Sequence, residues 1–193
     1  MLLADLQKPS PELIKRWADA LNANGFRQDM TDIDTFANCA LAAAYSGKNN
    51  LGIFALGDVG RGKTQFLKAL FAIQSKVCKR RTVFYSMKNP EHQEYLNYSK
   101  NYEWVKGLLE KNVIIDDFGS EAPENNYGVK SEPILDFILW YIESGKGILS
   151  ISSNLTGSKL LDRYTARVDA IREHLIIANF KGKNLREWLV ISG

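Results

Sequence analysis

Residues 51–66 place a short apolar run, a glycine-rich loop and a helical stretch in immediate succession. The loop fits the pattern of a glycine, four residues and Gly-Lys-Ser/Thr, and it reads Gly57, Asp58, Val59, Gly60, Arg61, Gly62, Lys63 and Thr64. Glycines in such a loop let consecutive backbone N–H groups converge on phosphate oxygens, and the following helix adds its positive end. The sequence therefore predicts a phosphate loop between a strand and a helix, rather than an accidental glycine-rich turn.

Side chains with matching chemistry occur in the loop and further along the chain. Lys63 can reach the β- and γ-phosphates of a nucleotide, and the hydroxyl of Thr64 can bind Mg²⁺. An apolar run, NVII, ends in Asp116, whose carboxylate can hold Mg²⁺ through water. Asp117 follows, where many ATPases use a glutamate to orient the attacking water. The alternative is that two acids simply end a strand, but the phosphate loop favours ATP and Mg²⁺ as ligands.

Short apolar runs alternate with helical stretches beyond the loop. We expect strands at 51–56, 82–86, 112–116, 147–152 and 174–179, and helices at about 63–77, 91–110, 130–144 and 158–170. This alternation predicts an α/β fold in which crossover helices cover a parallel sheet. A polar, turn-rich segment at 119–133 is of the kind that often borders an active site.

Two helices are expected before the first strand. Ser10 and Pro11 are typical of a helix start, and a second helix is expected from Thr31, with Asp34 three residues later, as far as Gly47. We therefore divide the chain into a short helical extension, residues 1–30, and one α/β domain, residues 31–193.

Composition narrows the class of protein. The chain has 193 residues, 45% of them hydrophobic, which suits one buried core. A net charge of +3 permits contact with nucleic acid without requiring it. Two cysteines are too few for a disulfide framework or a zinc site. No signal peptide or membrane-spanning run is visible, so we expect a cytoplasmic protein with no membrane partner.

Two later segments are further candidates for contact with a bound nucleotide. Residues 152–154, Ser-Ser-Asn, follow the next apolar run and could contact the attacking water or the γ-phosphate, although such residues are also ordinary turn chemistry. Arg163 and Arg167 lie four residues apart and are expected to share a helix face. A solvated basic face is the simpler interpretation. In a nucleotide switch, a guanidinium from a neighbouring subunit can instead stabilise the transferring phosphoryl group.

The segments GDVGRGKT, VIIDDFGSE, ISSNLTGSKLLDRYTARV and FKGKNLR together resemble the DnaC-type helicase loaders and the related IstB transposition ATPases, both of the AAA+ superfamily. The resemblance covers roughly residues 30–188. It implies a three-layer P-loop NTPase fold with five parallel strands, in which the 147–152 strand lies between the strands of the phosphate loop and Asp116. Asn154 matches the sensor-1 residue, and Arg186 lies near the sensor-2 position. Arg167 best matches the arginine finger, with Arg163 or Arg172 as alternatives.

The resemblance also implies a function. Family members are ATP-hydrolysing oligomers that bind single-stranded DNA and help place the replicative helicase on it, so we expect ATP-dependent homo-oligomers with these partners. An IstB-like transposition helper and a nucleotide-gated interaction module with little turnover remain alternatives. Family loaders also carry a longer N-terminal helicase-binding domain than residues 1–30. A small-molecule kinase is disfavoured, because neither an arginine-rich lid nor an acceptor site is recognisable.

Two groups of residues are candidates for contact with DNA. Basic residues can bind phosphates and aromatic residues can stack on bases. The basic group is Lys76, Lys79, Arg80 and Arg81, and the aromatic group is Tyr95, Tyr98, Tyr102 and Trp104. The alternative is that the basic residues are merely solvated and the aromatic residues pack against a neighbouring element.

Overall fold

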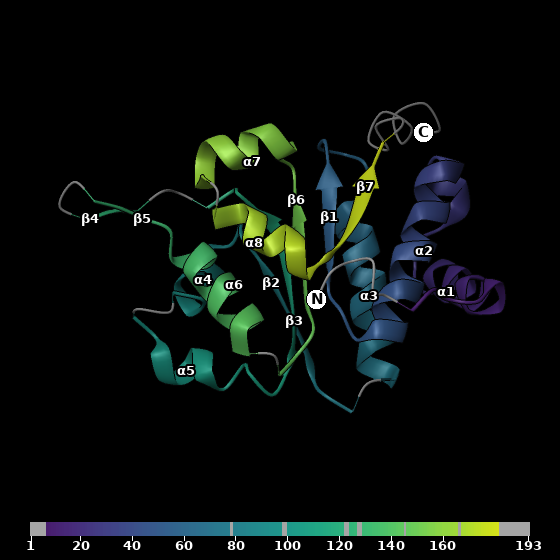
Figure 1. Cartoon of the computed structure of the whole chain (residues 1–193), viewed down its shortest axis with the longest axis horizontal. Coiled ribbons are helices and arrows are strands. Elements are labelled where there is room, and N and C mark those ends of the chain that lie inside the picture. The colour runs from purple at the N-terminus through teal and green to yellow at the C-terminus, as the bar shows by residue number, and fades with distance from the viewer. Residues whose placement is uncertain are drawn as a thin grey trace.

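The computed structural model describes residues 7–181 except 78, 98, 99, 122, 123, 127, 128, 145 and 166. A five-stranded sheet forms its centre (Figure 1). Its strands are β1 (Ile53–Gly57), β2 (Thr82–Ser86), β3 (Asn112–Phe118), β6 (Leu149–Ser153) and β7 (Ile176–Phe180). Every pairing in this sheet is parallel, and the order is β2-β3-β6-β1-β7. The predicted fold class is confirmed, and so is the place of β6 between β1 and β3.

Helices cover both faces of the sheet. The helices are α1 (Pro11–Ala23), α2 (Ile33–Asn49), α3 (Lys63–Val77), α4 (Pro90–Tyr95), α5 (Tyr102–Lys106), α6 (Pro133–Ser144), α7 (Gly157–Tyr164) and α8 (Arg167–His174), with a 3₁₀ turn, η2, at Gln28–Met30. Within the described part of the chain, none of them is long and apolar enough to cross a membrane.

Each face of the sheet has its own hydrophobic core, because side chains alternate along a strand. On β3, Ile114 packs into the core that α1, α2 and α3 cover, whereas Val113 and Ile115 pack into the core that α6, α7 and α8 cover. All seven residues of β3 are buried. The sheet is therefore a middle layer between two hydrophobic cores.

The predicted strands and the helix after the phosphate loop agree with the structure to within two residues, but two predicted helices are each divided. The stretch 91–110 forms α4 and α5, because Asn101 donates from its side chain to the carbonyl of Glu94 (2.6 Å) and competes with a continuous helix. The stretch 158–170 breaks at Thr165, which has a φ of 57°. Arg163 and Arg167 therefore lie on different helices, which corrects the expected shared face.

The described residues of segment 119–133 include two short strands that the sequence analysis did not predict. These strands, β4 (Glu124–Asn126) and β5 (Val129–Ser131), form an antiparallel hairpin, which Figure 1 shows projecting away from the rest of the molecule. The hairpin lies between the end of β3 and the start of α6.

The N-terminal helices begin largely where the capping residues predict. Ser10 caps α1 by accepting from the N–H of Leu13 (3.3 Å). The cap of α2 is Asp32 rather than Thr31, since its carboxylate accepts from the N–H of Thr35 (3.1 Å). Gly47 does not end α2, which continues to Asn49. A side chain at Gly47 would meet the ring of Trp17 (2.6 Å), so this glycine allows α1 to pack closely on α2.

Gly52, just before β1, permits a close approach between β1 and β6, and this approach is testable. A Cβ there would lie 1.5 Å from the backbone oxygen of Leu149. We predict that Gly52→Ala lowers the free energy of unfolding by about 3 kcal/mol, because two backbones must separate. Urea denaturation measures this change. Gly157→Ala is the control, since a Cβ there meets nothing within 4 Å. Equal stability of the two variants would contradict the close approach.

Candidate nucleotide site

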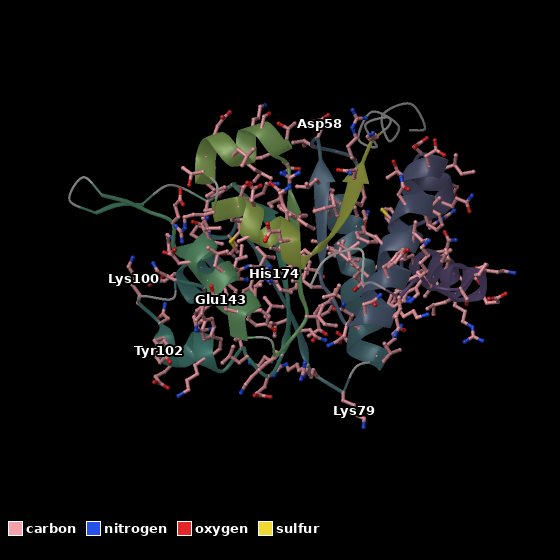
Figure 2. All side chains as sticks on the ribbon, viewed as in Figure 1. Asp58, Lys79, Lys100, Tyr102, Glu143 and His174 are labelled. Carbon is pink, nitrogen blue, oxygen red and sulfur yellow. The ribbon has the colours of Figure 1, made fainter. Side chains whose placement is uncertain are left out.

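The glycine-rich loop lies at the carboxyl end of β1, where Figure 2 shows Asp58. Gly60 and Gly62 have φ values of 81° and 90°, a region that residues with a Cβ rarely adopt. The loop leads directly into α3, whose first turn is closed by a bond from the N–H of Phe66 to the carbonyl of Gly62 (2.9 Å). The strand–loop–helix arrangement expected for a phosphate loop is therefore present.

Lys63 is the buried cation of this loop, with 4% of its surface exposed. Its ammonium group donates to the backbone carbonyls of Gly57 (2.6 Å) and Asp58 (2.7 Å). Burial lowers the pKa of Lys63 to about 8, although the carboxylates of Asp117 and Asp116 act in the opposite direction. The ammonium group is thus held against the first two residues of the loop.

Asp116 faces the loop from β3 and is 3% exposed. Its Oδ1 accepts from the hydroxyl of Thr64 (3.3 Å) and from that of Ser152 on β6. Burial raises the pKa of Asp116, and these two hydrogen bonds oppose the rise. Two oxygen ligands, one anionic and one neutral, are thus in contact across the gap between β3 and α3.

This pair of oxygens fits Mg²⁺, which prefers hard oxygen ligands and commonly takes one or two from the protein and the rest from phosphate and water. Within the described residues, no three His, Cys, Asp or Glu side chains group together as a metal cage. Thr64 and Asp116 are therefore the residues that would hold the ion.

Asp117 turns away from the regular course of β3. Its φ is 61°, and the pairing of β3 with β6 shifts register between Ile115 and Phe118. Such a bulge re-aims side chains. The carboxylate of Asp117 accepts from the side-chain amide of Asn154 (2.6 Å) at the end of β6. Two separately predicted candidate residues, Asp117 and Asn154, are therefore in contact.

Lys88 is a site residue that the sequence analysis missed. It lies two residues after β2, and its ammonium group contacts the carboxylate of Asp117 at 2.6 Å. Its place just past the carboxyl end of a predicted strand was the available signal, because parallel strands end at one edge of the sheet. Both oxygens of Asp117 thus have a partner, Asn154 on one and Lys88 on the other.

Glu121 also lies near the end of β3, but its carboxylate is engaged elsewhere. It is buried and accepts from the N–H of Gly119 (2.8 Å) and from the hydroxyl of Tyr164, whose ring stacks on Phe118 (4.7 Å). Arg163 lies 3.9 Å from the same carboxylate and donates to the backbone carbonyl of Glu121. These contacts fasten α7 to the end of β3.

The other candidate arginines contact acids of their own chain. Arg167 pairs with Asp136 on α6 and with Glu132 just before α6, and Arg172 pairs with Asp169 within α8 (3.3 Å). Arg186 lies outside the described residues. The structure therefore brings together the loop, Asp116, Asp117 and Asn154, whereas Arg167 lies with α6.

Comparison with solved structures gives proteins of the same fold. The crystal structure of DnaI aligns with a TM-score of 0.58 and 18% identity, covering 87% of this chain and 93% of that chain. The DnaC helicase loader aligns with a TM-score of 0.56 and 20% identity, covering 86% and 99%. The replication initiator DnaA, bound to AMPPCP and single-stranded DNA, aligns with a TM-score of 0.57 and 18% identity, covering 81% of this chain but only 48% of DnaA.

No protein-family model matches the chain, and no curated protein is significantly similar to it in sequence. The strand order and the strand–loop–helix arrangement give this chain the P-loop, AAA+ type of fold that these structures share. The resemblance to the DnaC-type loaders is thus confirmed at the level of the fold.

The burial of Lys63 predicts a pH dependence of stability. Its pKa in the folded chain, about 8, lies below the unfolded value of about 10.4, so the unfolded chain binds more protons between these pH values. Stability from this group therefore rises as the pH rises through that window, by roughly 3 kcal/mol. We predict that the unfolding free energy of wild type gains this much over Lys63→Met between pH 7.5 and 10.5.

Urea denaturation across that pH range tests the prediction. Lys68→Met is the matched control, because Lys68 lies on α3 but is exposed. Parallel pH curves for wild type and Lys63→Met would contradict the lowered pKa.

Proposed function

We propose that this protein is an ATP-hydrolysing accessory factor of DNA replication, similar in action to a helicase loader. The observation that carries the proposal is the meeting of Lys63 and Thr64, Asp116 and Asp117, and Asn154 at the carboxyl ends of three neighbouring strands. DnaI, the DnaC helicase loader and ATP-analogue-bound DnaA share this fold, which supports the same use of the site.

Each residue of the site has a role in this proposal. The backbone of residues 57–62 and the ammonium group of Lys63 bind the phosphates, and Thr64 and Asp116 hold Mg²⁺. The bound ion neutralises charge on the β- and γ-phosphates. Asp117, steadied by Asn154, orients the attacking water. Lys88 must give up its contact for Asp117 to serve fully in that role.

The proposal also extends to assembly. Arg167 of a neighbouring copy would act as the arginine finger, with Arg163 and Arg172 as alternatives, and Arg186 would contact the nucleotide from its own chain. Arg167 has 45% of its side chain exposed, and a surface ion pair such as its contact with Asp136 is weak enough to exchange for a phosphate. The active species is then an ATP-dependent homo-oligomer in the cytoplasm, with a replicative helicase as partner.

Single-stranded DNA is the second proposed partner, and the exposed aromatic residues between β2 and β3 support it. The rings of Tyr95 and Trp104 lie 5.7 Å apart, about half of the Trp104 side chain is exposed, and the ammonium group of Lys111 lies 5.8 Å from the Trp104 ring. Neighbouring, exposed aromatic rings beside a cation suit a base and its phosphate. Tyr98 lies outside the described residues.

The basic group lies around the end of α3 and the start of β2, whereas the described aromatic residues lie on α4 and α5. Figure 2 shows Lys79 and Tyr102 at well-separated places on the molecule. In the proposal they are two contact points along a DNA strand, with Lys76, Arg80 and Arg81 belonging to the first.

Two other functions use the same site. A transposition helper of the IstB kind would hydrolyse ATP but copurify with a transposase instead of a helicase. A nucleotide-gated module with little turnover is favoured by the full engagement of Asp117 with Asn154 and Lys88. Affinity purification of the tagged full chain and measurement of turnover separate these outcomes.

Hydrolysis is the first test. We predict that wild type with Mg²⁺ releases phosphate from ATP at least about 100-fold faster than Lys63→Ala, since the variant loses the cation at the phosphates. Asp117→Asn should bind ATP as wild type does and turn over at least about 10-fold more slowly. Phosphate release with and without single-stranded DNA is the measurement, and Lys68→Ala is the control. Wild-type turnover no faster than that of Lys63→Ala under every condition would leave the gated module as the better function.

Contact with DNA is the second test. We predict that Trp104→Ala weakens binding of labelled oligo-dT at least about 5-fold by fluorescence anisotropy, because base stacking contributes roughly 1–3 kcal/mol. Leu161→Ala, an exposed apolar residue on α7, should bind as wild type does. Identical affinities for wild type and Trp104→Ala would remove the aromatic residues from the DNA contact.

A further inference from the structure

Three serines of β6 are buried and bond to neighbouring strands. Ser150 accepts from the N–H of Ile53 on β1 (3.2 Å), and Ser153 donates to the carbonyl of Phe118 on β3 (2.7 Å). Ser152 differs from both, because its hydroxyl contacts the two acids at the end of β3. It is 1% exposed, so water cannot replace these contacts.

Asp117 needs an irregular backbone to reach its partners, whereas Asp116 lies on the α3 face that regular alternation from Ile114 gives it. Successive side chains of a regular strand point to opposite faces. Asp116 contacts Thr64 at the start of α3, and Asp117 contacts Asn154 at the end of β6. The register shift and the φ of 61° at Asp117 provide the required turn. A residue other than glycine is uncommon in this left-handed region and persists there only where its surroundings hold it.

The hydroxyl of Ser152 is placed to hold this turn. It accepts from the backbone N–H of Asp117 (3.0 Å), and it donates to Oδ1 of Asp116. A hydroxyl has one proton to donate, and the ionised carboxylate has none, so the direction of both bonds is fixed. One atom therefore fixes the backbone of Asp117 and the side chain of Asp116 together.

We propose that Ser152 is the positioning residue of the site: its hydroxyl holds the carboxylate of Asp116 beside Thr64 and, by holding the bulge of β3, directs Asp117 toward Asn154. The proposal rests on the proposed function for its consequence in nucleotide binding, whereas its structural part stands on the two hydrogen bonds alone. Ser152 is buried and acts through the two acids.

Ser152→Ala tests this role, and Ser150→Ala is its matched control. Both variants remove a buried hydroxyl from β6 that accepts a backbone N–H, but only Ser152 contacts the acids. Hydrogen exchange of the Asp117 amide, followed by NMR, should become about 10-fold faster or more in Ser152→Ala and stay unchanged in Ser150→Ala. The Mg²⁺ concentration for half-maximal ATP-analogue binding should rise several-fold in Ser152→Ala alone, with binding in EDTA unchanged.

The outcomes separate this proposal from the proposed function. Wild-type exchange at Asp117 in Ser152→Ala, or equal changes in both alanine variants, would overturn the positioning role. If Ser152→Ala does not fold, Ser152→Thr keeps the hydroxyl and should retain the wild-type Mg²⁺ response; loss of that response with the fold intact would also overturn it. If wild type binds no nucleotide, the proposed function fails, and the exchange at Asp117 still decides the role of Ser152.

Discussion

The pairing of β6 between β1 and β3 is the constraint on which the site depends. Parallel bonds align β6 with β1 from Phe54 to Leu56, and with β3 from Val113 to Ile115. The carboxyl ends of all three strands then meet at one edge of the sheet. The phosphate loop, the paired acids and Asn154 come from distant parts of the sequence, and this pairing makes them neighbours.

The site also balances its own charge. Burial acts on Lys63 and Asp116 in opposite directions, since it lowers the pKa of the cation and raises the pKa of the acid. Lys88 adds a second cation beside Asp117. Two ammonium groups and two carboxylates at one sheet edge make an assembly that is close to neutral. A nucleotide carrying several negative charges would disturb that balance, and its charge would act on Lys88 as well as on the loop.

The sequence was informative where structure is local. The glycine-rich loop between β1 and α3 follows from residues within one short segment, and the strands follow from their apolar runs. The contacts of Lys88 and Ser152 depend on strand order, which no spacing along the chain reveals. The break at Thr165 was also hidden, because apolar periodicity continues across a left-handed residue.

The left-handed backbone at position 117 favours aspartate over glutamate. Aspartate and asparagine enter this region several-fold more readily than most residues, since their short polar side chains can bond locally. Glutamate lacks this advantage. The shorter acid and the bulge are therefore suited to each other, and exchanging the acid for a longer one would require the backbone of β3 to change with it. A change from aspartate to glutamate at position 117 would therefore also affect the Ser152 hydroxyl, which accepts from the backbone N–H of Asp117.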